Sequence, residues 1–186
     1  MSGQTHKRFA ATLESERLHF RHFSAHDAQD LFEYAGDEET VRYLTWPRHK
    51  SVQESEEIIH KLLSNDQTYA IVLKQTDKVV GCIDLRLLTE TQASFGYVLN
   101  RAYWNQGFMS EALHCMLDYL FEELGMGEVE SCHEKENQAS GRVMTKCGMR
   151  WTHLALGETM FGKVSDNQHY SITREQWSEG KKSSSC

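Results

Sequence analysis

The chain has 186 residues, of which 39% are hydrophobic and 25% charged, a composition typical of a single globular domain with one core. Its formal net charge is −7 and its acidic residues are dispersed, which argues against nucleic acid as a partner because that partner requires a basic surface. Residues 1–17 hold no apolar run typical of a signal peptide, no later run could span a membrane, and the five cysteines lack paired spacing, so we expect a cytoplasmic protein with reduced thiols.

The first half of the chain predicts one strand, then three helices, then three closely spaced strands in an antiparallel meander. Alternating apolar residues mark the strands, whereas Ser24 and Ser51 have the sequence context of helix caps. The expected strands are Leu13 to Phe23, Tyr69 to Lys74, Val79 to Leu88 and Ala93 to Leu99, and the expected helices are Ala25 to Tyr34, Asp37 to Leu44 and a helix that begins after Ser51.

The second half predicts a long helix within a parallel crossover, followed by a shorter helix and two late strands. The long helix runs from Gly107 to about Leu124, and its apolar residues recur with helical period along one face. The remaining expected elements are a strand from Val129 to His133, a helix capped by Asn137 and ending at Cys147, strands from Met149 to Leu156 and His169 to Arg174, and a disordered tail from Ser178 to Cys186.

The turn before the long helix, Asn105-Gln106-Gly107-Phe108-Met109-Ser110, predicts an anion site. A short glycine-containing turn between a strand and a helix presents backbone N–H groups without intrahelical partners, at the positive end of the helix dipole. The turn lacks the spacing of a Walker loop and the three glycines of the dinucleotide fingerprint. Its alternative interpretation is a glycine that only opens a helix. On the anion interpretation, we expect a phosphate-bearing ligand here.

Four segments of the chain combine into a family pattern: Glu16 to Arg21, Phe95 to Leu99 with Tyr103 to Ala112, Glu136 to Val143 running into Lys146 to Met149, and Tyr170 to Trp177. In this order they resemble the GNAT superfamily of acetyl-coenzyme A-dependent N-acetyltransferases, in particular its RimJ/RimL-type branch. The resemblance implies one α/β (α+β) domain over residues 1–177, with a mixed, mostly antiparallel sheet, splayed central parallel strands and about four helices. It also implies an acyltransferase that moves the acetyl group of acetyl-CoA directly to a primary amine.

The resemblance assigns the cofactor to three segments. The backbone amides of the turn would hold the pyrophosphate, the splayed strand would pair with the pantetheine arm through a bulge, and the helix after Asn137 would line the same arm. Met109 stands where the family usually has Gly or Ala, so its side chain must point away from the phosphates. The implied cofactor residues are Tyr97, Val98, Leu99, Gln106, Gly107, Phe108, Met109, Ser110, Asn137, Ser140 and Val143.

Two catalytic tasks follow from the same resemblance. A freed backbone N–H on the splayed strand, assigned to Val98, would donate to the oxyanion, and Ser140 would donate to the leaving thiolate. From the residues alone, Asn137 is a helix cap and Ser140 a first-turn residue, and both interpretations can hold together because a helix N-terminus points toward a ligand seated there.

The general base is the weakest part of the pattern. Related enzymes often carry a glutamate two residues before the position of Gly96, where this chain has Ser94. The ten histidines are dispersed without ligand spacing, so no metal is expected. His133 and His153 are the histidines to test as bases, although packed or solvated histidines are the alternative for both.

The missing carboxylate bears on the acceptor. An α-amine with a pKa near 8 is roughly one-tenth neutral at pH 7, whereas a lysine with a pKa of about 10.4 is neutral about once in a few thousand. We therefore expect the acceptor to be a protein or peptide N-terminal α-amine of the ribosomal-protein type, or a small-molecule amine. We expect the enzyme itself to be a monomer or homodimer. The alternative is a non-catalytic GNAT-like module that binds CoA or a metabolite.

Overall fold

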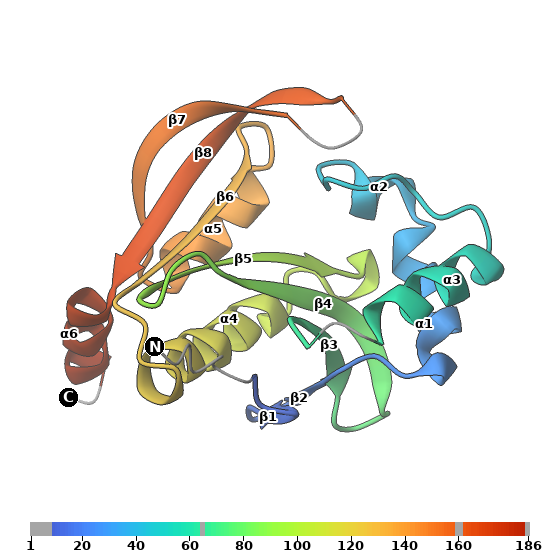
Figure 1. Cartoon of the computed structure of the whole chain (residues 1–186), viewed down its shortest axis with the longest axis horizontal. Coiled ribbons are helices and arrows are strands. Elements are labelled where there is room, and N and C mark those ends of the chain that lie inside the picture. Colours follow the sequence, from blue (N-terminus) through green and yellow to red (C-terminus); the bar gives the residue numbers. More distant parts are fainter. Residues whose placement is uncertain (1–8, 64–65, 159–161, 185–186) are drawn as a thin grey trace, which may run out of the picture.

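The computed structural model describes residues 9–63, 66–158 and 162–184, with the elements drawn in Figure 1. The strands are β1 (Thr12–Glu14), β2 (Leu18–Arg21), β3 (Thr68–Leu73), β4 (Lys78–Leu87), β5 (Gln92–Leu99), β6 (Glu128–Glu134), β7 (Arg150–Glu158) and β8 (Val164–Thr173). The helices are α1 (Ala28–Ala35), α2 (Glu38–Val41), α3 (Val52–Leu62), α4 (Phe108–Asp118), α5 (Gln138–Lys146) and α6 (Arg174–Ser184).

The strands of the described residues form one sheet in the order β1-β2-β3-β4-β5-β6-β8-β7. All neighbours are antiparallel except β5 and β6, which are parallel and joined through α4. The expected meander is β3-β4-β5, and the expected crossover is β5-α4-β6. The predicted fold class, a single α/β domain with a mixed and mostly antiparallel sheet, is confirmed.

The parallel pair β5–β6 separates after three residues. Residues 92–94 pair with residues 128–130, and in the described part of the chain the rest of β5 has no partner strand on that side. At the point of separation the buried Ser131 hydroxyl donates to the Phe95 carbonyl oxygen at 2.8 Å. The predicted splay is present, but the expected bulge in β5 is not, because β5 keeps an uninterrupted register with β4 over residues 93–99.

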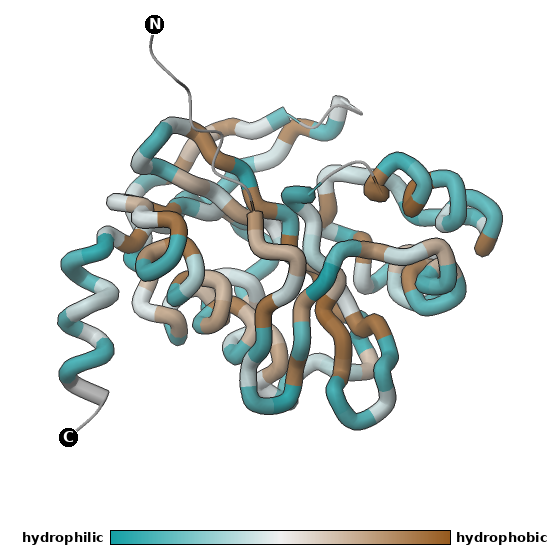
Figure 2. Tube along the Cα trace, turned by 60° about the horizontal axis from the view of Figure 1, so that its bottom comes forward, coloured by the Kyte–Doolittle hydropathy of each residue, from teal (hydrophilic) through white to brown (hydrophobic). Residues whose placement is uncertain are grey.

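Apolar side chains are buried on both faces of the sheet. The α4 stripe predicted from Ala112 onward packs on one face with Phe20, Ile71 and Leu85, whereas α1 and α3 cover the other face through Leu31 and Ile59. Figure 2 shows hydrophobic residues concentrated along the central strands, while α6 is mainly hydrophilic. Each face of the sheet therefore packs against its own hydrophobic core.

The N-terminal prediction of one strand over Leu13 to Phe23 is wrong. The chain turns back after β1, because the backbone N–H of Ser15 donates to the Leu18 carbonyl at 2.9 Å, and β2 pairs antiparallel with β1. Leu18 and Phe20 do face the core together, as the alternation predicted.

The helices also differ from the expectation. The structure describes six α-helices rather than about four, and α4 gives way at Asp118 to a π-helical segment, Tyr119–Glu123. The predicted disordered tail is wrong over residues 178–184, which continue α6 across the expected domain end at 177. The Trp177 ring packs against Phe121 with centroids 5.2 Å apart, which anchors this helix. Residues 185 and 186 lie outside the described residues.

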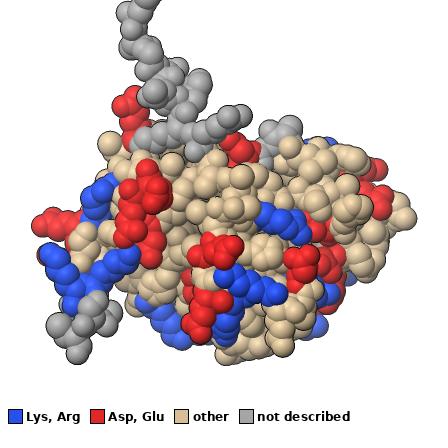
Figure 3. Space-filling view, turned by 90° about the horizontal axis from the view of Figure 1, so that it is seen from below, with Lys and Arg blue, Asp and Glu red and all other residues tan. Residues whose placement is uncertain are grey.

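The charges on the surface are dispersed, as they are along the sequence. In the face drawn in Figure 3, acidic and basic side chains are interspersed rather than gathered by sign. Within the described ranges, no helix has both the length and the apolar character needed to cross a membrane.

Candidate active site

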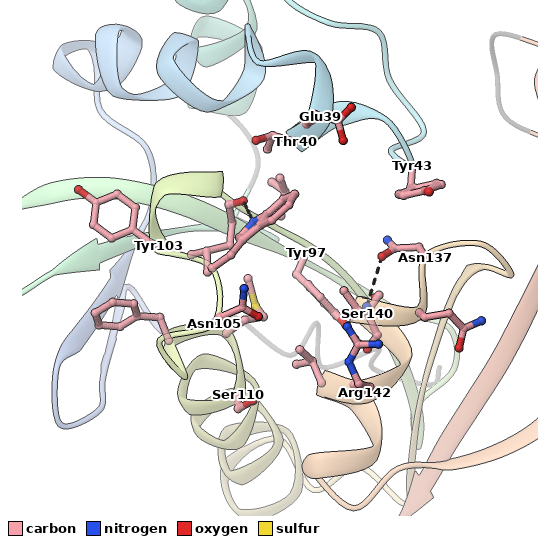
Figure 4. Close-up of a pocket in the computed structure, with 18 of the residues that line it drawn as sticks. Glu39, Thr40, Tyr43, Tyr97, Tyr103, Asn105, Ser110, Asn137, Ser140 and Arg142 are labelled. Atoms are coloured by element: carbon pink, nitrogen blue, oxygen red, sulfur yellow. Dashed lines mark hydrogen bonds between the residues drawn. The ribbon is translucent and has the colours of Figure 1, made fainter.

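A cleft of about 630 Å³ lies where β5 has separated from β6 (Figure 4). Its walls are the end of β5, the turn before α4, the start of α5 and, opposite these, α2 with the residues after it. Every predicted cofactor residue except Gln106 lines it: Tyr97, Val98, Leu99, Gly107, Phe108, Met109, Ser110, Asn137, Ser140 and Val143. The fold thus brings together the three segments that the family pattern had singled out.

The turn before α4 has the geometry of an anion site. Gly107 is the N-cap residue with φ +81°, in the left-handed region that glycine tolerates, and no side chain caps the helix. The first intrahelical bond runs from the Glu111 N–H to the Gly107 carbonyl (3.0 Å), so the N–H groups of Phe108, Met109 and Ser110 precede the helical ladder. Those three donors fit a pyrophosphate.

Met109 does not obstruct this turn with a solvent-facing side chain. It is only 6% exposed and belongs to the hydrophobic core beneath the sheet. The unusual residue at this position is therefore accommodated by packing it inward.

The start of α5 forms the second polar wall. The Asn137 side-chain oxygen accepts from the Ser140 backbone N–H at 3.3 Å, as drawn in Figure 4, so Asn137 is the predicted N-cap. Gly148, with φ +84°, follows the helix end at Cys147. The cap occupies the backbone of Ser140 and leaves its hydroxyl for other contacts.

The Ser140 hydroxyl lies 2.7 Å from the Tyr97 hydroxyl, which also donates to the Ser140 carbonyl oxygen at 3.0 Å. Burial raises the pKa of the Tyr97 phenol above its usual value, and the bond to Ser140 offsets only part of that shift. Tyr97 therefore stays protonated and is a hydrogen-bond donor. The sequence predicted Tyr97 only as a cofactor contact, because the hydroxyl pair joins residues far apart in the chain.

The backbone of β5 alternates in direction. The carbonyls of Phe95 and Leu99 point away from β4, and the Trp104 indole N–H donates to that of Leu99 at 2.7 Å. The Val98 carbonyl points toward β4, because a Cβ added to Gly81 would stand only 2.2 Å from its oxygen. The residues between follow the same alternation.

This alternation overturns one prediction. The N–H and C=O of a strand residue point to the same side, so the Val98 N–H faces β4 and not the cleft. The prediction of Val98 as the oxyanion donor is therefore wrong. The N–H groups on the cleft side of β5 belong to Tyr97 and Leu99, one residue to either side.

The two histidines considered as bases lie elsewhere. His133 is buried beneath α5, where one ring nitrogen contacts the Glu134 carbonyl (2.7 Å) and the other stands 2.6 Å from where a Cβ on Gly141 would be. His153 stacks on His169 on β7 and β8, with centroids 4.5 Å apart. Neither residue lines the cleft, so the structure does not support either as the base.

The sequence analysis predicted a helix over Asp37 to Leu44 but named none of its residues as part of the site. Glu39, Thr40 and Tyr43 line the cleft opposite Tyr97 and Ser140, and Glu39 and Glu136 are the carboxylates among its described lining residues. These residues could not be assigned from the sequence because the position of α2 over the cleft depends on how the N-terminal helices pack over the sheet.

Comparisons with known proteins agree with the family resemblance of the sequence. The profile of the acetyltransferase (GNAT) domain matches residues 17–150. The N-acetyltransferase p20 of Bacillus licheniformis, described as uncharacterized, is 27% identical over 174 residues, which cover 89% of this chain and 98% of that protein.

Solved structures share the fold. A protein described as a ribosomal-protein-serine acetyltransferase from Vibrio cholerae superposes with a TM-score of 0.77 at 24% identity, covering 87% of this chain and 97% of that one. Spermidine N-acetyltransferase from Vibrio cholerae, solved with CoA and spermine, gives a TM-score of 0.72 at 17% identity, covering 87% and 98%.

Fold, cleft and family profile together define an acyltransferase of the α/β type. The chain belongs to the GNAT family of acetyltransferases. Enzymes of this family take the acetyl group from acetyl-CoA, and the N–H groups that precede the helical ladder of α4, together with the edge of β5 that has separated from β6, fit that cofactor.

Proposed function

We propose that the enzyme is a cytoplasmic N-acetyltransferase of the RimJ/RimL-type branch, whose acceptor is the α-amine of a peptide or protein N-terminus. The observation that carries the proposal is the Tyr97–Ser140 hydroxyl pair, set between the open edge of β5 and the turn at Gly107. The fold shared with a protein described as a ribosomal-protein-serine acetyltransferase supports the choice of branch.

The cofactor would lie along three walls of the cleft. Its pyrophosphate would accept from the N–H groups of residues 108–110, and its pantetheine arm would pair with the cleft-side backbone of Tyr97 and Leu99. Asn137 and Val143 on α5 line the same path. When bound, acetyl-CoA supplies an activated acetyl thioester.

Groups of the protein would stabilise the oxyanion and protonate the leaving thiolate. The Tyr97 N–H takes over the oxyanion role that had been given to Val98, because it faces the cleft. As the C–N bond forms and the C–S bond breaks, the Ser140 hydroxyl gives its proton to the departing sulfur, and Tyr97 holds that hydroxyl in place. The amine loses its own proton to water, and water returns a proton to Ser140, so the serine hydroxyl is restored at the end of the reaction.

The acceptor would enter between α5 and α2. Glu39 and Glu136 are carboxylates that line this path and could bind the amine, although Arg42, which also lines the cleft, stands 3.6 Å from Glu39. No carboxylate stands at Ser94, so an amine of low pKa is the most reactive acceptor. The fold shared with a spermidine N-acetyltransferase supports a small-molecule amine as the second candidate.

An acceptor screen tests the proposal. The protein is incubated with acetyl-CoA and a panel of N-terminal peptides, lysine peptides with blocked α-amines, and polyamines, and products are scored by mass spectrometry. We expect acetylated α-amines. Products on polyamines alone would favour the second candidate, and CoA binding without product on any amine would favour the non-catalytic module.

A further inference from the structure

Arg17, which is far from α4 in sequence, contacts the turn that precedes this helix. Arg17 lies between β1 and β2, and its Nε donates to Glu111 Oε2 at 2.6 Å. One terminal nitrogen of the same side chain donates to the Gln106 carbonyl at 3.1 Å, and the guanidinium carbon stands 4.2 Å from the centre of the Phe108 ring. A single side chain thus contacts the residues immediately before and after Gly107.

The carboxylate of Glu111, which pairs with Arg17, lies close to the proposed phosphate site. Glu111 is in the first turn of α4, the same turn that carries the N–H groups proposed to hold the pyrophosphate. Its other oxygen accepts from the Arg17 backbone N–H and the Ser15 hydroxyl, each at 2.7 Å. Burial alone would raise the pKa of Glu111, but these bonds lower it below its usual value, so the group is ionised. An unpaired anion here would repel phosphate.

The geometry points to Arg17 as a positioning residue for coenzyme A: it fixes the turn around Gly107 and neutralises Glu111, so that the helix N-terminus accepts a pyrophosphate. This inference rests on the proposed cofactor site and assigns the control of that site to the β1–β2 turn. A second terminal nitrogen of Arg17 stands 3.4 Å from where a Cβ on Gly107 would be, so the guanidinium packs directly on the turn.

A purely structural ion pair would behave differently. Arg17 is 43% exposed, and exposed pairs contribute little to stability. Cofactor affinity is therefore the informative measurement. Arg21 offers a matched control, because it lies on the adjoining strand β2 and pairs with Asp27 through two hydrogen bonds of 2.7 and 2.9 Å, outside the cleft.

The experiment compares Arg17→Ala and Arg21→Ala by calorimetric titration with CoA and, separately, with pantetheine, which lacks the pyrophosphate. Thermal unfolding confirms that each variant is folded. We expect Arg17→Ala to weaken CoA binding by about 10- to 100-fold, the scale of one or two charge-assisted contacts, with pantetheine binding unchanged. Arg21→Ala should bind CoA like the wild type.

Two further variants separate charge from shape. Arg17→Lys keeps the positive charge but loses the planar guanidinium, which contacts Glu111 and Gln106 at the same time. CoA affinity should therefore fall between that of the wild type and that of Arg17→Ala. Adding Glu111→Gln to Arg17→Ala should recover part of the loss, because the repelling carboxylate is gone. If Arg17→Ala does not fold, Arg17→Lys and Glu111→Gln carry the test. Wild-type CoA affinity in the Arg17 variants overturns the inference, whereas a wild type that does not bind CoA overturns the proposed cofactor site instead.

Discussion

Ser140 carries two separate functions on one residue. Its backbone N–H is held by the Asn137 cap, and its hydroxyl lies 2.7 Å from Tyr97 in the cleft. An alanine keeps the N–H and loses only the hydroxyl. The substitution therefore isolates the proposed proton donor from the helix cap.

Ser140→Ala should lower kcat by about 100-fold with CoA affinity nearly unchanged, as expected for a principal general acid. Steady-state kinetics and calorimetric titration measure the two quantities. Thr145→Ala is the matched control, since it also removes a hydroxyl from α5. The Thr145 hydroxyl donates to the Gly141 carbonyl, and Thr145 does not line the cleft. A wild-type kcat in Ser140→Ala would exclude this serine as the acid.

The absence of a carboxylate at Ser94 sets a second expectation at this scale. At pH 7, peptides with a free α-amine should react faster than peptides with only a lysine amine, because a far larger fraction of the α-amine is neutral. Initial rates with paired peptides, one form blocked at its N-terminus and the other at its lysine, provide the measurement. Equal rates would require a dedicated base, and Glu39, the α2 carboxylate that lines the cleft, would be the residue to substitute.

At the scale of elements, the turn into α4 contains two left-handed residues, Asn105 with φ +59° and Gly107 with φ +81°, and Gly107 is the N-cap of the helix. Gly107→Glu should abolish CoA binding, because it adds bulk and negative charge beside the anion site. Gly107→Ala should destabilise the fold by about 1 kcal/mol, since a Cβ is disfavoured at φ +81°. Gly125→Ala is the control for the strain alone, with φ +68° and a position outside the cleft. Equal CoA affinity in Gly107→Glu and the wild type would move the phosphates elsewhere.

Features set by neighbouring residues were predictable from the sequence, and features set by register were not. The Asn137 cap, the glycine-bearing turn and the stripe of α4 each follow from a few adjacent residues. The direction of the Val98 N–H instead depends on the pairing of β5 with β4, where a shift of one residue reverses every group. The folded-back β1 and the helical residues 178–184 likewise depend on distant partners.

The candidate site followed the same division. Its cofactor segments were predictable because each is a local motif, although their meeting in one cleft required the family pattern. Tyr97 and Ser140 form a pair only through the packing of α5 against β5, and Arg17 reaches Glu111 only through the β1–β2 turn. Contacts of this kind leave no spacing in the sequence.

At the scale of the whole molecule, the N-terminal strand is tied to the helical layer by a partly buried ion pair. Arg21 donates twice to Asp27, and the Ser24 N–H donates to the same carboxylate at 2.7 Å. Burial of Asp27 would raise its pKa, but these bonds lower it below the usual 3.8. The carboxylate thus contributes stability above pH 3.8 that is lost as the pH falls through its lower folded-state pKa.

Asp27→Asn should lower the free energy of unfolding by about 1–3 kcal/mol at pH 7, because Arg21 is left without its charged partner. The difference from the wild type should shrink once the pH falls below the ordinary aspartate pKa of 3.8. Denaturant titrations at pH 7 and at successively lower pH compare the two proteins. A difference that stayed constant down to acid pH would show that protonation of Asp27 is not involved.

The early separation of β5 from β6 affects how fast individual backbone amide protons of β5 exchange with solvent. In the free protein, the N–H groups of Gly96 and Val98 face β4 and should exchange slowly with deuterium, whereas those of Tyr97 and Leu99 face the cleft and should exchange quickly. A bound pantetheine arm would protect the fast pair and leave the slow pair unchanged. Residue-resolved exchange would thus appear as an alternating pattern along four consecutive amides, fast sites becoming slow only when CoA is present.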